Sequence, residues 1–409
     1  MRRTLTLLLA LLLLMGLPVS ALAAEEGHQH SYDIPAGDGL CTVCGEPCTH
    51  SVWLDGVCQI CGARCPHPGW EDGRCTLCRF PCPHDRHDGN TMRCSLCGEF
   101  VSHTYQDGVC VMCSQGPWFQ DQLLPAYLFA PSEHKGSVQT LSYQTRNYAA
   151  QRAGDKPDPY TKKLCVYLPY GYDAGKPYDV LVLMHGMGGS ERYWLLEDQV
   201  YFDITEAKVK TTDLVENMVA LGTARECIIV TPTFYINSGN QLQYNRYREQ
   251  DQFTMELRND ILPLIVEKFS TYASAPTQEA ISQAREHFAY AGLSMGSIYG
   301  FNAVLPMCLD LFGWFGEFSG SECWPDLVIS ALNAQTDRYP IYWLYNAAGL
   351  NDTMYKNHID QYRLLVQNCR GLTEGVNASF TSIRGVMHEY RAWGTGLYNF
   401  LLVVFANHK

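Results

Sequence analysis

The chain of 409 residues is 46% hydrophobic and 12% aromatic, enough to fill the cores of about two or three domains. Its formal net charge is -12 at pH 7, which disfavours nucleic acid or an anionic membrane surface as a partner. Beyond the N-terminal targeting segment, no stretch is apolar for long enough to cross a bilayer.

Residues 1–24 have the features of a signal peptide. Residues 2–3 form a positive region, residues 5–17 an apolar core, and residues 21–23 a cleavage site of the Ala-x-Ala type, with 22–24 as the alternative. The apolar core is short for an uncleaved anchor. We therefore expect a secreted, extracellular mature protein without a membrane span.

Residues 25–115 form a second region, built on a cysteine and histidine repeat. The stretch from Glu25 to Cys113 holds 13 of the 18 cysteines and no lysine. Its unit is Cys-x-His, a spacer and then Gly-x-Cys-x-x-Cys, recurring about every 17 residues. A Cys-x-x-Cys turn presents two thiolates to one ion, and the paired Cys and His complete a tetrahedron. The repeat therefore predicts structural zinc sites.

Three copies of the unit are complete, a first copy has two histidines and two cysteines, and a last copy lacks one ligand. The expected zinc ligands are His28, His30, Cys41 and Cys44; Cys48, His50, Cys58 and Cys61; Cys65, His67, Cys75 and Cys78; Cys82, His84, Cys94 and Cys97; and His103, Cys110 and Cys113. A shifted frame, in which Cys41, Cys44, Cys48 and His50 share one ion, remains open. We expect about four zinc ions per chain, in closed sites that hold the short units folded.

The array has two other interpretations. Dense cysteines in an exported protein usually form disulfides, but an odd cysteine count and a histidine in every unit favour zinc. Nucleic-acid-binding fingers are disfavoured, because residues 25–113 carry 12 acidic and 5 basic side chains. A protein or cell-surface partner of the array is possible, and the sequence does not name one.

Residues 116–136 form a junction with three prolines among aromatic and apolar residues, which we expect to pack onto the next domain. Residues 137–409 alternate strand and helix patterns, which predicts an α/β domain with a mostly parallel sheet and helices on both faces. The expected strands are residues 138–144, 164–168, 180–184, 227–230, 288–291, 314–318, 341–345 and 380–383. Helices are expected at residues 251–269, 296–305 and 389–405.

The central motif of this domain is Gly292-x-Ser294-x-Gly296, between an expected strand and an expected helix. The motif alone is weak evidence, since an ordinary glycine-rich turn can contain it. In a strand-turn-helix setting, however, the turn pushes the serine hydroxyl clear of the sheet, and the glycines let neighbouring backbone pass close by. Ser294 is therefore the predicted nucleophile.

A serine nucleophile needs a base, and the base needs an orienting acid. In this setting the acid and then the base follow the serine in chain order, each after a later strand. Asp352 and His388 occupy these two places, just past the carboxyl edge of the sheet where sites on such sheets lie. The predicted catalytic triad is Ser294, Asp352 and His388.

The rival acids and bases are less well placed. Asp337 precedes its strand, His358 and Asp360 lie in an expected helix, and His287 precedes the nucleophile strand. Each is more simply interpreted as a structural or surface residue.

The glycine-rich loop from His185 to Gly189 follows the strand at 180–184. Its backbone N–H groups can face a bound ester, so it is a candidate oxyanion hole. The expected donors are the amides of Met295 and Met187, with Gly186 as the alternative to Met187. His185 itself is expected to be structural.

These motifs resemble those of the exported feruloyl and acetylxylan esterases. The matching segments are Leu168-Pro-Tyr-Gly-Tyr172, the His-Gly-x-Gly-Gly loop, Gly-Leu-Ser-Met-Gly, Phe318-Ser-Gly320, and Gly385-x-x-His388 through Trp393. The resemblance runs from about residue 138 to the C-terminus. It implies an α/β-hydrolase fold and de-esterification of plant cell-wall polysaccharide. The cysteine and histidine array lies outside the family pattern.

We therefore expect a secreted serine esterase that removes feruloyl or acetyl groups from polysaccharide and needs no cofactor for catalysis. Trp194, Tyr235 and Trp324 are candidate substrate-binding aromatics near the rim, although such residues are more often core. Two alternatives stay open. In the first, the hydrolase domain is catalytically inactive and the array binds a protein or a surface. In the second, the fold catalyses another acyl reaction, such as that of a peptidase, thioesterase or acyltransferase.

Overall fold

The computed structural model describes residues 119–152, 154–202, 208–235, 252–320 and 324–406, together with eight short strands nearer the N-terminus. The chain divides into two compact units. The first comprises residues 1–88 and 93–99, and the second comprises residues 89–92 and 100–409.

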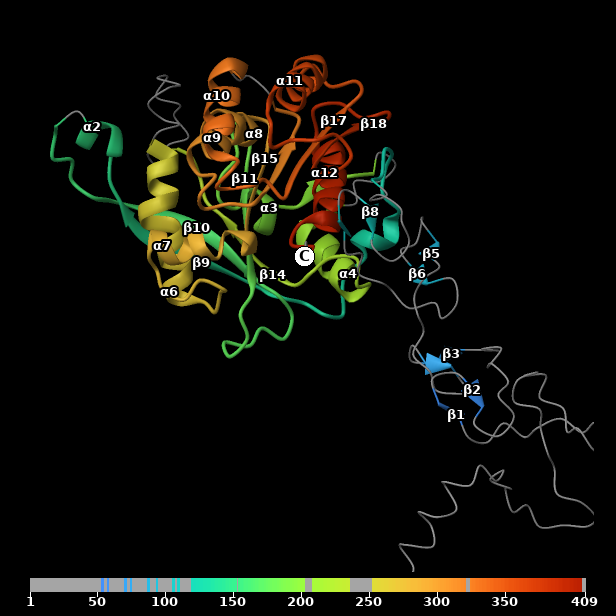
Figure 1. The fold of residues 1–409 in the computed structure, drawn as a ribbon. Helices are drawn as coiled ribbons and strands as arrows, with labels where there is room; N and C mark the ends of the chain where they lie inside the picture. Colours follow the sequence, from blue (N-terminus) through green and yellow to red (C-terminus); the bar gives the residue numbers. More distant parts are fainter. Residues whose placement is uncertain are drawn as a thin grey trace, which may run out of the picture. The chain divides into compact units, whose positions relative to one another are not determined.

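The second unit is built around an eight-stranded sheet (Figure 1). In spatial order its strands are β18 (Ala378–Ile383), β17 (Trp343–Gly349), β16 (Trp314–Phe318), β15 (Phe288–Leu293), β11 (Asp179–Met184), β14 (Cys227–Thr231), β10 (Tyr160–Leu168) and β9 (Ser137–Thr145). The strands from β18 to β14 pair in parallel, whereas β10 is antiparallel to both β14 and β9. The predicted α/β fold with a mostly parallel sheet is confirmed.

The central strands are mostly apolar, with buried Asp179, Glu317 and Asn346 as exceptions, because both of their faces are covered. Every residue of β11, β14, β15, β16 and β17 is buried. Along β11, Val180 and Val182 enter one hydrophobic core, and Leu181 and Leu183 enter the core on the opposite face.

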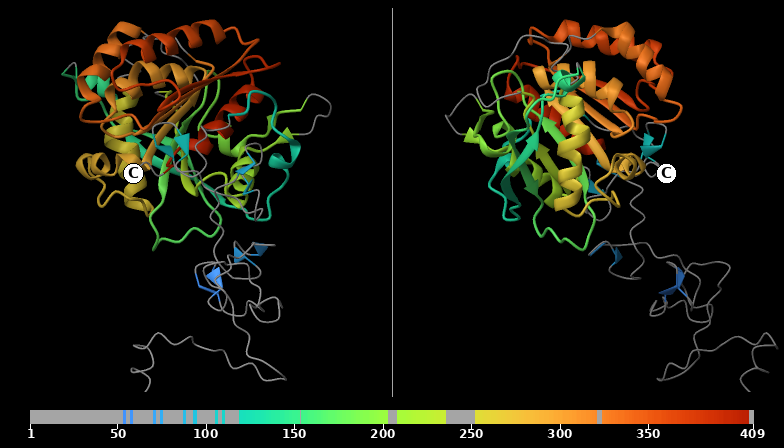
Figure 2. Two further views of the ribbon diagram at one scale, coloured as in Figure 1. Left: turned by 45° about the vertical axis from the view of Figure 1, so that its right-hand side comes forward. Right: turned by 90° about the vertical axis from the view of Figure 1, so that its left-hand side faces the viewer.

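Helices cover both faces of the sheet (Figure 2). One core is completed by η2 (Leu257–Ile261), α6 (Leu262–Lys268), α7 (Gln278–Gln283), α8 (Met295–Tyr299), η4 (Gly300–Val304), α9 (Leu305–Met307), α10 (Pro325–Gln335) and α11 (Tyr355–Asn368). The other is completed by η1 (Ala126–Phe129), α3 (Tyr193–Leu196), α4 (Thr211–Ala220) and α12 (Tyr390–Val403). The remaining elements are α2 (Tyr148–Arg152), β12 (Gln199–Val200), β13 (Lys208–Val209) and η3 (Arg285–His287).

All eight strands expected from the sequence are present, and their ends differ by a few residues. The strand expected at 341–345 is β17, which starts at Trp343 and runs to Gly349 because its last residues continue to pair with β18. The helix expected at 251–269 contains the π-helical turn η2, and the one expected at 296–305 contains η4.

The described part of the junction, residues 119–136, packs onto the sheet and helices of the second unit. Leu124, Leu128 and Phe129 are buried in the core beside α4 and α12. The amide of Gln120 donates to Asn399 Oδ1 at 2.7 Å, and the amide of Arg384 donates to the Asp121 carbonyl at 2.7 Å.

Four short antiparallel hairpins are described in the N-terminal region. They pair β1 (Trp53–Leu54) with β2 (Val57–Cys58), β3 (Trp70–Glu71) with β4 (Arg74–Cys75), β5 (His87–Asp88) with β6 (Arg93–Cys94), and β7 (Tyr105–Gln106) with β8 (Val109–Cys110). Each second strand ends at the first cysteine of a Cys-x-x-Cys motif. The side chains of the expected zinc ligands, and the whole of the expected signal peptide, lie outside the described residues.

Cys165, Cys227, Cys308 and Cys369 are buried free thiols, while Cys323 lies outside the described residues. In the described ranges, no three His, Cys, Asp or Glu side chains gather as a metal site. No helix in that part of the chain has the length and apolar character needed to span a bilayer.

Candidate active site

Ser294 sits in a sharp turn between β15 and α8. Its φ of 50° and ψ of -117° are strained for a residue other than glycine, at a cost on the order of 1–3 kcal/mol. A Cβ at Gly292 would lie 2.5 Å from the Gly296 carbonyl carbon, and a Cβ at Gly296 would lie 2.5 Å from the His185 carbonyl oxygen. Both glycines are therefore required for the turn to close.

Asp352 and His388 lie in loops at the ends of two other strands of the same sheet. Asp352 follows β17, and His388 follows β18. His388 Nε2 lies 2.9 Å from Ser294 Oγ, and His388 Nδ1 lies 3.0 Å from each carboxylate oxygen of Asp352. The structure thus brings the three predicted residues into one hydrogen-bonded chain.

The protons in this chain can be assigned from the partners. A carboxylate only accepts, so His388 Nδ1 donates to Asp352, and the neutral ring leaves Nε2 free to accept from the Ser294 hydroxyl. The Asp352 side chain is fully buried, whereas that of His388 is 32% exposed. Burial raises the pKa of Asp352, but hydrogen bonds from His388 and from the Met354 amide outweigh it, so the net pKa is lowered. Asp352 is therefore the charged partner.

The loop proposed as the oxyanion hole runs beside Ser294. A Cβ at Gly186 would lie 2.6 Å from Leu293 Cδ1 and 3.1 Å from Ser294 Cβ, so only glycine fits there. The loop turns at Gly188, whose φ is 79°, and the Gly189 amide donates to the Gly186 carbonyl at 3.1 Å. Met295 is the first residue of α8, a position whose N–H has no partner within the helix. The loop that carries Met187 and the start of α8 that carries Met295 thus both adjoin Ser294.

Two of the three aromatics expected at the rim are buried instead. Trp194 is 1% exposed, and its indole N–H donates to the Met184 carbonyl at 3.0 Å. Tyr235 is 5% exposed, and its hydroxyl accepts from the Gly188 amide at 2.7 Å. Both predictions of substrate contact are wrong, because these rings fill the core and support the loop. Trp324, at 43% exposure, is the one that reaches solvent.

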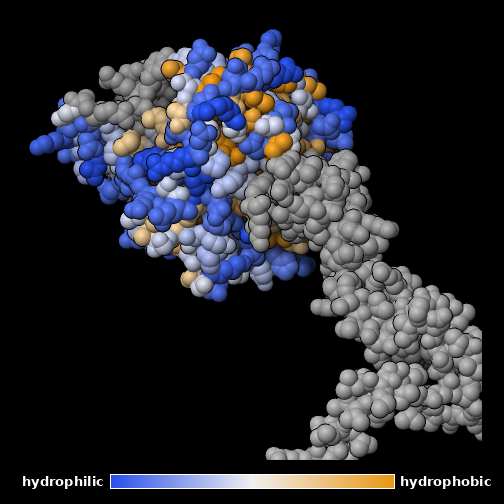
Figure 3. Space-filling model, viewed as in Figure 1, coloured by the Kyte–Doolittle hydropathy of each residue, from blue (hydrophilic) through white to orange (hydrophobic). Residues whose placement is uncertain are grey.

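Exposed apolar side chains adjoin the candidate site residues in sequence. Met187 is 63% exposed in residues 185–189, the expected oxyanion-hole loop, called the oxyanion loop below. Met387 is 55% exposed beside His388, and Leu350 is 44% exposed just before Asp352. In Figure 3 the visible face is mostly hydrophilic, with apolar residues gathered over the region that Figure 1 labels α10, α11 and β17. The loops that carry the polar site residues thus also present apolar surface.

His358, one of the rejected bases, is a buried residue of α11. Its Nε2 donates to Asn346 Oδ1 at 3.1 Å, its Nδ1 has no hydrogen-bond partner among the described residues, and the rings of Phe301 and Phe380 pack edge-on against it. Burial lowers the pKa of His358 to about 3. The folded protein therefore favours the neutral ring. As the pH falls, His358 becomes protonated in the unfolded state and the free energy of unfolding decreases.

Replacing His358 by glutamine should make the domain less acid-sensitive. Between pH 6.5 and pH 5 the unfolded histidine binds a proton that the folded one does not, so wild type should lose about 2 kcal/mol of unfolding free energy through His358. Denaturant unfolding at pH 7 and pH 5 measures the difference between His358→Gln and wild type. Glu317, whose pKa is raised well above its usual range by burial, acts in the opposite direction in both proteins and cancels. An equal pH dependence in both would contradict this role.

Comparison with known proteins places this site in a family. The family model described as "Putative esterase" matches residues 161–398. Endo-1,4-beta-xylanase Y of Acetivibrio thermocellus is 31% identical over 204 residues, which are 48% of this chain but only 17% of that protein. The chain therefore spans less than a fifth of this curated relative.

Solved structures with the same fold include two feruloyl esterases. A mutant of the feruloyl esterase module from Clostridium thermocellum, complexed with sinapinate, has a TM-score of 0.59 and 25% identity, covering 76% of this chain and 99% of that one. The ferulic acid esterase of the anaerobic fungus Anaeromyces mucronatus, in complex with ferulic acid, has a TM-score of 0.54 and 21% identity, covering 71% and 98%.

Proposed function

The chain belongs to the esterase family and has its α/β-hydrolase fold, and from this premise we propose that it is a secreted serine esterase acting on plant cell-wall polysaccharide. The observation that carries the proposal is the hydrogen-bonded chain from Ser294 through His388 to Asp352. The xylanase relative supports a polysaccharide-linked ester as the substrate.

The proposed reaction proceeds through an acyl-enzyme. His388 Nε2 takes the Ser294 proton as Oγ attacks the ester carbonyl, and Asp352 stabilises the imidazolium that forms. The amides of Met295 and Met187, or of Gly186 in place of Met187, donate to the oxyanion. When the tetrahedral intermediate collapses, the C–O bond to the alcohol breaks and His388 protonates the leaving oxygen. Water, deprotonated by His388, then attacks the acyl-enzyme and releases the acid and free Ser294.

We propose an aromatic acyl group of the hydroxycinnamoyl type, with acetyl as the lesser substrate. The exposed side chains of Met187, Leu350 and Met387 support this choice, because an acetyl group is too small to cover them, whereas a phenylpropenoyl group gains free energy by burying them. The two similar esterases bind sinapinate and ferulic acid, which are acids of this type.

A substrate panel tests this proposal. We expect kcat/KM for a feruloylated arabino-oligosaccharide to exceed that for an acetylated xylo-oligosaccharide by at least about tenfold. Met387→Ser, an exposed change, should lower feruloyl turnover several-fold and leave acetyl turnover unchanged. Faster acetyl turnover would contradict the aromatic preference, and no turnover of any ester in the panel would contradict the esterase function.

We propose that the N-terminal array binds zinc in the exported protein and holds its short units folded. Each hairpin ends at a Cys-x-x-Cys motif, which supports the ligand assignment. Metal analysis of the purified mature protein should find about four zinc ions per chain. An array with no metal and with its cysteines oxidised would contradict this and favour disulfides. A protein or cell-surface ligand of the array stays a proposal.

A further inference from the structure

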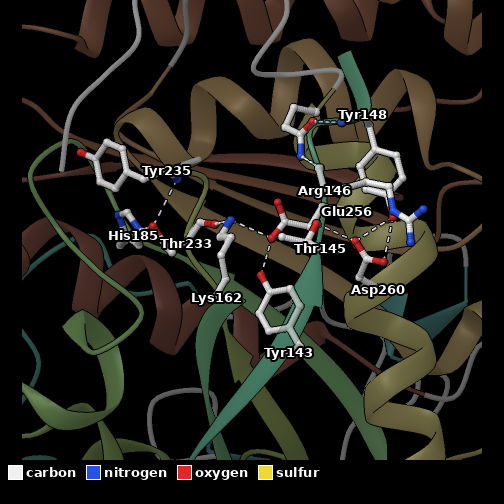
Figure 4. Close-up of polar contacts among 11 residues, drawn as sticks. Tyr143, Thr145, Arg146, Tyr148, Lys162, His185, Thr233, Tyr235, Glu256 and Asp260 are labelled. Carbon is white, nitrogen blue, oxygen red and sulfur yellow. Dashed lines mark hydrogen bonds and ion pairs between the residues drawn. The ribbon is translucent and has the colours of Figure 1, made fainter. Parts of the chain in front are cut away.

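A line of buried polar contacts joins the antiparallel side of the sheet to the oxyanion loop (Figure 4). It begins at a buried ion pair between Lys162 of β10 and Glu256, which immediately precedes η2. Lys162 Nζ lies 2.7 Å from Glu256 Oε1, and the two side chains are 5% and 1% exposed. Glu256 also accepts a hydrogen bond from the Tyr143 hydroxyl. Two charges this deeply buried are tolerated only with such partners.

The ammonium of Lys162 has a second partner, in the segment after β14. It donates to the Thr233 carbonyl oxygen at 2.7 Å. Thr233 belongs to residues 232–235, which leave the carboxyl edge of the sheet next to the loop that follows β11. Lys162 therefore holds the backbone of Thr233 in place.

Thr233 in turn holds His185 through its hydroxyl. His185 Nδ1 lies 2.7 Å from the Gly186 carbonyl oxygen, which can only accept, so Nδ1 carries the proton. His185 Nε2, 2.9 Å from Thr233 Oγ1, must then accept from the Thr233 hydroxyl. Burial, the largest cause, together with the nearby Lys162 cation, lowers the pKa of His185 to about 4, so this arrangement persists at neutral pH.

His185 is in direct contact with the catalytic turn and the oxyanion loop. Its carbonyl oxygen lies so close to Gly296 that a Cβ there would be 2.5 Å away, and its side chain would be 3.0–3.2 Å from a Cβ on Gly189. Tyr235 supplies a second attachment, since its hydroxyl accepts from the Gly188 amide and its ring stacks on His185 at 5.6 Å. The loop is therefore held from both ends.

We propose that Lys162 and Thr233 are positioning residues for the esterase reaction, which hold His185 and so keep the amides of the oxyanion loop where the developing charge forms. The proposal rests on the proposed function. Neither residue touches the reacting atoms, so both act through His185.

The hydroxyl of Thr233 can be tested with a nearly isosteric pair. Thr233→Val removes the donor to His185, and we expect kcat for p-nitrophenyl acetate to fall about tenfold with KM little changed, because an oxyanion donor acts only in the transition state. Thr233→Ser keeps the hydroxyl and should restore most of kcat. Inhibition by phenylboronic acid, whose adduct on Ser294 places an oxygen at the oxyanion position, should weaken about tenfold in Thr233→Val. Thr161→Val, which removes a hydroxyl exposed on the same sheet edge, is the control.

Lys162 is tested by removing both charges together, since Lys162→Met alone would leave the Glu256 carboxylate buried without a cation. The double variant Lys162→Met/Glu256→Gln should lose kcat to about the same extent as Thr233→Val. Adding Thr233→Val to it should cause little further loss, because all three changes interrupt one line of contacts. The control is Lys176→Met/Glu226→Gln, which removes an exposed ion pair.

Several outcomes would overturn the proposal. A Thr233→Val enzyme with wild-type kcat and an unchanged melting temperature would overturn it, as would equal losses in Thr233→Ser and Thr233→Val. Additive losses would overturn the joint action of Lys162 and Thr233. Failure of the proposed function is distinguishable, because Ser294→Ala would then hydrolyse the ester as fast as wild type, and this inference would fail with it.

Discussion

Replacing Ser294 by alanine should lower kcat for ester hydrolysis by about a millionfold. Among the described residues of the site, the Ser294 hydroxyl is the group placed to form an acyl-enzyme, 2.9 Å from the base that takes its proton. His388, Asp352 and the oxyanion loop would remain, but without the oxygen they have nothing to activate. The residual rate should be only what binding and the oxyanion donors supply, a factor of about 10³–10⁴ over water.

The measurement is steady-state hydrolysis of p-nitrophenyl acetate, with single-turnover kinetics to detect the acyl-enzyme burst. Ser282→Ala, a partly buried serine of α7 away from the site, is the matched control and should keep the wild-type rate. Wild-type turnover or a retained burst in Ser294→Ala would show that another residue is the nucleophile.

Replacing Asp352 by asparagine should lower kcat by about 10⁴-fold while the fold is retained. The carboxylate accepts from His388 Nδ1 and so keeps the unprotonated Nε2 toward Ser294. An asparagine of the same shape can turn its NH₂ group toward Nδ1, which would then accept, and the ring proton would move to Nε2. That nitrogen could no longer take the serine proton.

The loss should appear in kcat with KM little changed, because the substrate does not contact the buried carboxylate. Asp326→Asn, at an exposed position in the first turn of α10, is the control and should behave as wild type. A decrease of less than about tenfold in Asp352→Asn would be too small for a residue that sets the histidine tautomer and would assign the orienting role elsewhere.

The sequence patterns predicted the sheet well because the parallel central strands are mostly apolar. The runs at β11 and β14 needed no tertiary information, because short apolar runs rich in valine and isoleucine favour buried strands. The rule that the acid and then the base each directly follow a later strand selected Asp352 over Asp337, which precedes its strand. It also selected His388 over His358, which lies in an expected helix. Chain order worked because the fold places each successive loop at the same edge of the sheet.

The aromatics show where this reasoning fails. Trp194 and Tyr235 follow strands just as Trp324 follows one, and nothing in the local pattern separates a ring that covers the core from one that faces substrate. Burial depends on which helix lies above the residue, and that is a property of the whole fold.

Lys162, Thr233 and Glu256 had no signal in the sequence. A lysine among apolar residues of a strand, a threonine in a loop and a glutamate in a helix are ordinary in isolation. Lys162 and Thr233 are 71 residues apart in the chain, and Tyr143 and Glu256 are 113 apart. These residues meet only once β10, β14 and the helix before η2 are assembled.

By itself the sequence determined the fold class, the turn that carries Ser294 and the two loops that supply Asp352 and His388, because local apolar patterns and chain order decide these. Only the tertiary structure decided the distances between these groups, the burial of Trp194 and Tyr235, and the support of His185 by Thr233. The physical reason is that hydrogen bonds act over about 3 Å, and which distant side chains come that close depends on how the sheet and its helices pack.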